Sequence, residues 1–145
     1  MEVKIKKLND LAKIPTRGSE YAAGYDLYAA ISEPVVIRPH TTEKIGTGLS
    51  FELPEHTFGA IFARSGLATK MGLAPANKVG VCDEDYRGEY IVALHNHSNE
   101  DKIVSPGERI AQLILLPYVP MEFIEVDNLS NTERADGGFG HSGNK

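Results

Sequence analysis

The chain has 145 residues, 41% of them hydrophobic, which is enough for one hydrophobic core and too few to suggest two domains. Its single cysteine, Cys82, excludes an intrachain disulfide and suits a reducing cytoplasm, and no stretch approaches the roughly 20 apolar residues that span a membrane. A net charge of -5, without a run of lysines or arginines, argues against nucleic acid as a partner but is compatible with a small phosphate ligand.

Short apolar and β-branched runs recur along the chain, and proline or glycine separates them. We expect strands at residues 3–8, 25–30, 35–38, 44–53, 59–63, 89–95, 110–116 and 123–126. The segment from Ser65 to Met71 has the composition of a helix and would make about two turns. The pattern therefore predicts an all-β fold, a sandwich or a barrel, with one short helix.

Two further segments have distinctive turn or tail chemistry. The run from Asp83 to Gly88 begins with acidic residues and ends on a glycine that can adopt a positive φ, so we predict a hairpin tip there. Residues 134–145 hold four glycines around one aromatic residue, which is too flexible a composition to become ordered by itself. We predict a β domain over residues 1–133 and a flexible arm over 134–145 that orders over a ligand.

Asp26 and the segment after residue 63 carry the first groups suited to a nucleotide. Strand alternation turns the Asp26 carboxylate away from its apolar neighbours, toward solvent or toward a site. Arg64 can bind two phosphate oxygens, and Gly66 allows close approach to the backbone beside Ser65. Taken alone, these residues also fit a solvated strand aspartate and a helix N-cap.

Residues 76–90 are the most informative stretch. Their free backbone groups could pair with a nucleobase, while Asp83 polarises a water molecule near the sugar. The alternative is an acidic solvated turn, in which Tyr86 packs on the sheet and Cys82 is a small buried hydrophobic residue. On the residues alone, the solvated turn is slightly favoured.

The last two stretches lie in the C-terminal third of the chain. Arg109 and Gln112 are the polar exceptions in an apolar strand, and a buried glutamine needs a backbone or phosphate partner. In the tail, Arg134 supplies a positive charge and Phe139 a stacking surface among flexible hydrogen-bond donors. This composition suits a lid over a base and its phosphates; a disordered end is the alternative.

In this order and at these intervals, the five stretches closely resemble the five signature motifs of the trimeric dUTPase family over essentially the whole chain. The resemblance implies a jelly-roll-like subunit, a homotrimer, and active sites between subunits that C-terminal arms close. It implies hydrolysis of dUTP to dUMP and pyrophosphate by attack of water on the α-phosphorus, with Mg²⁺ bound to the triphosphate. Such an activity limits uracil entry into DNA and supplies dUMP for thymidylate synthesis.

The resemblance also implies roles for single residues. Asp83 would be the general base, and Asp26 would orient the water shell of Mg²⁺ without necessarily touching the ion. Tyr86 would stack on deoxyribose where a 2′-hydroxyl must be refused. Backbone groups of the hairpin would pair with uracil, leave groups unpaired against cytosine, and have no room for the methyl group of thymine. The implied substrate-binding residues are Arg64, Ser65, Gly66, Asn77, Gly80, Val81, Cys82, Tyr86, Ile91, Gln112, Arg134, Phe139, Gly140, His141 and Ser142.

Two positions depart from the family pattern, and two other functions compete with it. Ala135 stands where glycine is common, and His141 where serine is frequent, although neither change affects Asp83. One alternative is a dCTP deaminase-like enzyme of the same fold, but the residues around Arg64 fit the hydrolase pattern. The other is a non-catalytic nucleotide-binding regulator, which the presence of Asp83 and the arm disfavours.

Overall fold

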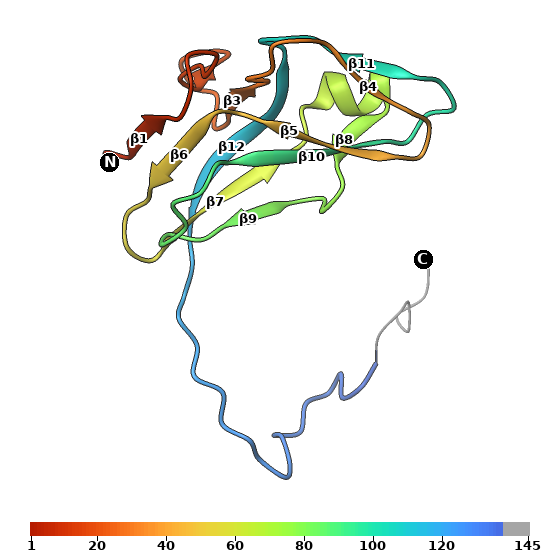
Figure 1. Cartoon of the computed structure of the whole chain (residues 1–145). Helices are drawn as coiled ribbons and strands as arrows, with labels where there is room; N and C mark the ends of the chain where they lie inside the picture. The colour runs from red at the N-terminus through yellow and green to blue at the C-terminus, as the bar shows by residue number, and fades with distance from the viewer. Residues whose placement is uncertain (138–145) are drawn as a thin grey trace.

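The computed structural model describes residues 1–137, which form twelve strands and one helical turn (Figure 1). No helix in this range is long and apolar enough to cross a membrane. The elements are β1 (Lys4–Lys7), β2 (Thr16–Arg17), β3 (Tyr25–Tyr28), β4 (Val35–Ile37), β5 (Thr42–Gly46), β6 (Leu49–Glu52), β7 (Thr57–Phe62), η1 (Leu67–Met71), β8 (Leu73–Pro75), β9 (Gly80–Cys82), β10 (Ile91–Asn96), β11 (Lys102–Val104) and β12 (Arg109–Pro117).

Two antiparallel sheets make up most of the body. The larger has the order β2-β3-β12-β7-β9, and the smaller has the order β5-β10-β8. The strand pairs β1-β6 and β11-β4 complete the fold. Apolar residues from both sheets, including Leu27, Ile61, Ile45 and Leu94, are buried together in one core. The prediction of an all-β, jelly-roll-like subunit is confirmed.

Strand alternation gives the five-stranded sheet an inner and an outer face. Leu113 on β12 packs in the core, so its neighbours Gln112 and Ile114 point outward. Directly opposed residues on antiparallel strands share a face. The register pairs Gln112 with Asp26 on one side and with Phe62 on the other, so all three lie in one outward row. This face carries several of the predicted site residues.

The structure corrects several predicted elements. The run 44–53 is divided into β5 and β6, because Gly48 adopts a positive φ of 65° between them. The helix expected over residues 65–71 is a single turn, Leu67–Met71. Residues 123–126 form no strand, because no other described strand pairs with them; Phe123 is 87% exposed. The sequence pattern does not predict β2, β8, β9 and β11, because two or three residues are too few to show a period.

The predicted hairpin around Asp83 is also wrong. β9 pairs with β7 in the five-stranded sheet, whereas β10 pairs with β5 and β8 in the three-stranded sheet. The residues between β9 and β10 therefore form a loop that passes from one sheet to the other. Acidic and glycine-rich turn chemistry is shared by hairpins and by such loops, so composition alone does not separate them.

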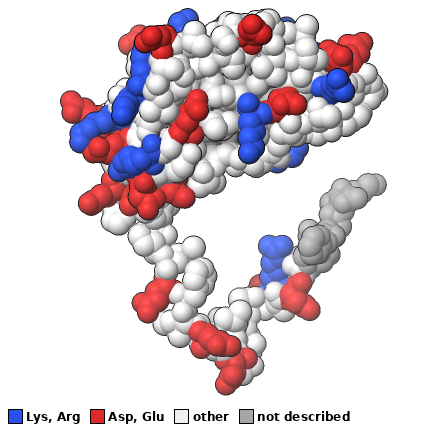
Figure 2. Space-filling view, viewed as in Figure 1, with Lys and Arg blue, Asp and Glu red and all other residues white. Residues whose placement is uncertain are grey.

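After Pro117 the chain leaves the body, and residues 118–137 extend away from it without a strand or helix (Figure 1). Large apolar side chains along this segment, such as Val119, Met121 and Leu129, are more than 70% exposed. Acidic residues are interspersed along the same segment, as Figure 2 shows. A run of exposed apolar side chains marks a surface that another molecule covers.

Candidate active site

Asp26 is the centre of a polar group on the outer face of the five-stranded sheet. It is only 8% exposed, and each of its carboxylate oxygens accepts a hydrogen bond from an arginine. Arg64 donates from Nε to Oδ1 at 2.8 Å, and Arg109 donates from Nη1 to Oδ2 at 3.2 Å. One carboxylate therefore holds two guanidinium groups side by side, and the half-exposed Arg109 has further N–H groups available for an anion.

Gln112 adjoins this group from β12. Its amide Nε2 donates to the carbonyl of Ala63 at 2.9 Å, immediately before Arg64. A Cβ at Gly24 would collide with the Gln112 side chain, so the glycine leaves the space that the amide occupies. We call Asp26, Arg64, Arg109 and Gln112 the arginine cluster. In the sequence, Arg109 stands out only as a polar exception in an apolar strand, because its contact with Asp26 depends on the register between β3 and β12.

Ser65 and Gly66 follow the arginine cluster and lie exposed at the start of η1. A Cβ added at Gly66 would meet no atom within 4 Å, so the backbone there is open to approach. The Ser65 carbonyl accepts a hydrogen bond from Thr69 Oγ1 at 2.7 Å, which fixes the turn. Both residues directly follow Arg64 in the chain and are exposed beside it.

A second group of predicted residues surrounds β9. Gly80 is buried, the side chain of Val81 is 63% exposed, and Cys82 is half-buried. Asp83 follows and is exposed, and its carboxylate makes no hydrogen bond within residues 1–137. It lies at a hollow of about 570 Å³ whose lining residues are Phe58, Val81, Asp83, Glu84, Asp85 and Tyr118. A carboxylate at such a place is available to a water molecule.

Burial and nearby carboxylates raise the pKa of two groups close to Asp83. Burial raises the pKa of the Cys82 thiol to about 11, and the Asp83 carboxylate adds to this effect, although the Tyr90 side chain opposes it. Loss of solvent contact, followed by the nearby Glu84 carboxylate, raises the pKa of the Tyr118 hydroxyl. Neither the Cys82 thiol nor the Tyr118 hydroxyl is an anion at neutral pH.

The arginine cluster and Asp83 lie far apart in one chain. Cys82 is opposite Gly59, so Asp83 lies level with Phe58, four residues along the sheet from the row that contains Asp26. β3 and β9 are also three strands apart. With about 3.3 Å per residue and about 4.8 Å per strand, the separation is on the order of 20 Å.

The remaining predicted residues lie apart from both groups or outside the description. Asn77 is exposed between β8 and β9, and Ile91 begins β10 in the smaller sheet. Arg134 lies in the extended segment, where its Nε donates to the Gly137 carbonyl at 2.9 Å. Ala135 adopts a φ of 44°, a conformation that costs alanine more than glycine. The predictions for Phe139, Gly140, His141 and Ser142 lie outside the described residues.

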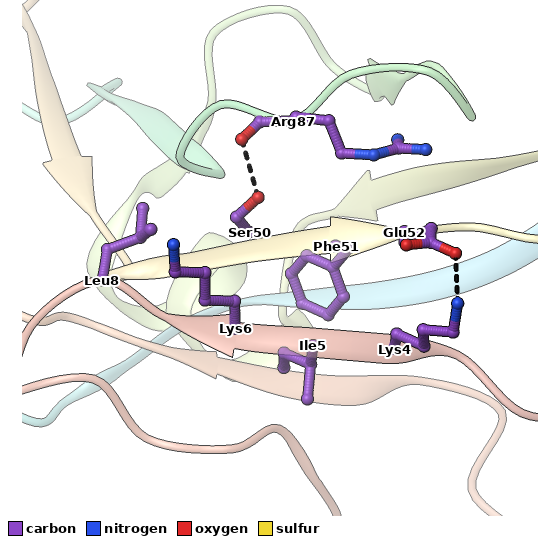
Figure 3. A pocket seen from close by; sticks show the side chains of 8 residues that line it. All are labelled: Lys4, Ile5, Lys6, Leu8, Ser50, Phe51, Glu52 and Arg87. Carbon is purple, nitrogen blue, oxygen red and sulfur yellow. Dashed lines mark hydrogen bonds and ion pairs between the residues drawn. The ribbon is translucent and has the colours of Figure 1, made fainter.

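A second hollow, of about 340 Å³, contains none of the predicted site residues (Figure 3). Its lining residues are Lys4, Ile5, Lys6, Leu8, Ser50, Phe51, Glu52 and Arg87. Ser50 Oγ donates to the Arg87 carbonyl there at 2.7 Å, which ties the loop after Asp83 to β6. The hydrogen bond within this hollow therefore helps to position the loop after Asp83.

The donor set suits a magnesium ion that the protein contacts through water. Within residues 1–137, no three His, Cys, Asp or Glu side chains are arranged to hold a metal ion. The Asp26 oxygens already accept from two arginines. Mg²⁺ retains several water ligands and binds readily to phosphates, so these residues fit an ion that phosphate oxygens and water coordinate.

Comparisons with known proteins agree with this arrangement. Residues 10–143 match the dUTPase family. The chain is 49% identical over 143 residues to the deoxyuridine 5'-triphosphate nucleotidohydrolase of Nautilia profundicola, covering 99% of each, and 43% identical over 145 residues to that of Hydrogenobaculum sp., covering 100% of each. The structure of Staphylococcus bacteriophage 80alpha dUTPase with dUPNHPP matches with a TM-score of 0.85 and 28% identity, over 98% of both chains. The chain thus belongs to the dUTPase family of enzymes that hydrolyse dUTP to dUMP and pyrophosphate.

Proposed function

We propose that each active site is formed between copies of the chain in a homotrimer. The arginine cluster of one copy binds the phosphates of dUTP, and Asp83 of a neighbouring copy activates the attacking water. The separation of about 20 Å between the two groups carries this proposal, because a general base must lie within about 3 Å of the water it deprotonates. A triphosphate bound at Arg64 and a water held by Asp83 of the same copy would not meet.

Asp83 is the general base in this proposal. Its carboxylate accepts a proton from water as the water oxygen attacks the α-phosphorus, and pyrophosphate leaves with the electron pair of the broken P–O bond. The exposed position of Asp83, without a hydrogen bond from residues 1–137, supports the assignment. Its effectiveness depends on the position of the carboxylate more than on its basicity.

The arginine cluster binds the phosphate chain. Two guanidinium groups and one carboxylate give Asp26, Arg64 and Arg109 a formal charge of +1, whereas a triphosphate carries several negative charges. Mg²⁺, when bound to the phosphates, supplies further positive charge, and Asp26 orients its water shell. Ser65, Gly66 and Gln112 add hydrogen bonds to phosphate oxygens.

The β9 region selects the nucleoside. Backbone groups around Asn77, Gly80, Val81 and Cys82 pair with the uracil edge, together with contacts from Ile91. Tyr86 lies against the deoxyribose and sterically excludes a 2′-hydroxyl group. Arg134 and the residues from Phe139 to Ser142 close over the base and phosphates from a neighbouring copy's arm.

Two apolar surfaces support assembly from several copies. The outer face of the large sheet exposes part of Phe58, Phe62, Ile114 and Leu116, and the segment after Pro117 exposes a run of apolar side chains. Covering both surfaces with neighbouring copies would remove apolar area from water at about 25 cal/mol per Å². The unpaired Cys82 thiol is consistent with a cytoplasmic location.

Mixing two inactive variants tests the shared site. We would co-express Asp83→Asn with Arg64→Ala, purify the mixed trimers, and measure pyrophosphate release from dUTP. Each variant alone should be nearly inactive, whereas random mixing should restore about one quarter of the sites, each with both intact halves. Recovery no greater than the sum of the separate variants, in oligomers shown by light scattering to be mixed, would contradict the proposal.

A further inference from the structure

We propose that Tyr90 is a positioning residue for substrate selection: its buried ring fixes the orientation of Tyr86 and thereby the rejection of ribonucleotides. The inference rests on the proposed contact of Tyr86 with deoxyribose. Tyr90 is 1% exposed, so it offers almost no surface to a substrate. Its effect on substrate choice must therefore pass through Tyr86.

The backbone and ring of Tyr90 are both anchored. Its N–H donates to the Leu49 carbonyl at 2.8 Å, and its carbonyl accepts from Thr47 Oγ1 at 2.6 Å and from Thr47 N at 3.2 Å. On β6, the ring of Phe51 packs against it with centroids 4.4 Å apart. Tyr90 thus has a single position, set by β6 and the residues before it.

The tip of the Tyr90 ring fills the space beneath β9. A Cβ at Gly59 would lie 3.2 Å from the Tyr90 hydroxyl oxygen, and Gly59 is directly opposite Cys82 in the sheet. The Tyr90 side chain also interacts with the Cys82 thiol, whose pKa burial raises and Tyr90 lowers. One aromatic side chain therefore supports the base-reading strand as well as the loop that follows it.

Tyr86 is held against this support from three sides. Its ring stacks on Tyr90 with centroids 6.2 Å apart and an angle of 28°, and its hydroxyl donates to the Glu89 carbonyl at 3.1 Å. A Cβ at Gly88 would collide with the Tyr86 ring, so only glycine lets the ring fold back over the loop. Ser50 pins the same loop at Arg87, as Figure 3 shows. Nearly half of Tyr86 remains exposed.

Whether Tyr86 can discriminate between deoxyribose and ribose depends on how firmly its ring is held. Deoxyribose and ribose differ by one hydroxyl group, and a ring that is free to tilt would make room for it. Selectivity requires a side chain whose rotamer is locked by the residues behind it. Tyr90 is the aromatic residue behind Tyr86, so removal of its ring should relax the choice between dUTP and UTP.

The Tyr90 hydroxyl provides a control for the ring. It is the one buried side-chain polar atom in residues 1–137 without a hydrogen bond of standard geometry, although it interacts with the adjacent Cys82 thiol, and burial raises its pKa, so it stays protonated. Removing the hydroxyl alone therefore separates this interaction from the packing of the ring. Tyr90→Phe removes the hydroxyl and keeps the ring, whereas Tyr90→Leu removes the ring and keeps an apolar side chain.

The test measures kcat/KM for pyrophosphate release from dUTP and from UTP with wild type, Tyr90→Phe, Tyr90→Leu, Tyr86→Ala and Tyr86→Ala/Tyr90→Leu. The dUTP-to-UTP ratio should fall about tenfold in Tyr90→Leu and stay at the wild-type value in Tyr90→Phe. In the Tyr86→Ala background, Tyr90→Leu should cause no further fall. Both substrates are assayed on one preparation, so the ratio does not depend on how much of a variant is folded.

Three outcomes overturn the inference. A wild-type ratio in Tyr90→Leu, with a lowered ratio in Tyr86→Ala, would show that Tyr86 selects the sugar without Tyr90. An equal fall in Tyr90→Phe would assign the effect to the hydroxyl. A wild-type ratio in Tyr86→Ala would refute the sugar contact of Tyr86, and the inference with it, while leaving dUTP hydrolysis and the shared site intact.

Discussion

The arginine cluster and the loop between β9 and β10, which we call the β9 loop, are held in place by different kinds of interaction. In the cluster, side chains hold side chains: Asp26 accepts from Arg64 and Arg109. In the β9 loop, hydrogen bonds from side-chain hydroxyls to backbone carbonyls and stacked rings fix the chain, and the Asp83 carboxylate makes no hydrogen bond in the described part of the protein. In the proposed assembly, the arginine cluster of one copy is therefore already arranged for phosphate, whereas Asp83 meets the substrate only through a neighbouring copy.

Asp83→Asn tests the chemical half of this comparison and should have the largest effect. The amide keeps the size of the side chain but cannot take a proton from water, so kcat should fall on the order of 100-fold or more. Because Asp83 is proposed to act on the attacking water while the arginine cluster binds the phosphates, KM for dUTP should change little. Steady-state kinetics of pyrophosphate release provide the measurement, and an unchanged kcat would refute the general-base role.

Truncation after Glu133 removes the arm and should have the next largest effect. Loss of Arg134 and of the stacking residue Phe139 should lower turnover by tens of fold, because positive charge and water exclusion are lost from the phosphates. The body, with its core in the strands before Pro117, should keep its melting temperature. Wild-type turnover from the truncated chain would show that the arm is dispensable.

Asp26→Asn tests whether the arginine cluster binds the phosphates of the substrate. Replacing the carboxylate leaves two arginines with one amide oxygen between them, so the cluster loses its geometry and kcat/KM should fall about tenfold, mainly through KM. Glu52→Gln is a matched control, since Glu52 pairs with Lys4 at the exposed edge and such pairs contribute little. A fall in kcat alone would contradict the assignment of Asp26 to binding.

Ser50→Ala should have the smallest effect and tests how the β9 loop is held. Losing the hydrogen bond to the Arg87 carbonyl should lower the free energy of unfolding by about 1 kcal/mol. Urea denaturation measures this, with Ser32→Ala as a control, because the Ser32 side chain makes no hydrogen bond in residues 1–137. Equal stability of the two variants would show that the loop does not depend on this contact.

The sequence shows which residues are candidates for a site better than it shows which strands pair with one another. Asp26, Arg64 and Gln112 can be selected because charged and amide groups stand out among apolar strand residues, and the all-β class follows from the strand-like runs. The role of Arg109 cannot be derived in that way, because its contact with Asp26 depends on which residues of β3 and β12 are opposite each other. The hairpin predicted around Asp83 is wrong for a similar reason, because turn composition does not specify which sheet the next strand joins.

The exposed segment after Pro117 has a consequence for how activity returns after unfolding. The core lies in the strands up to β12, so each chain can complete it alone, at a rate independent of protein concentration. The proposed docking between copies would be bimolecular and would slow on dilution. After a jump out of denaturant, signals from the buried tyrosines would recover first, and the delay before pyrophosphate release resumes would lengthen as the protein is diluted.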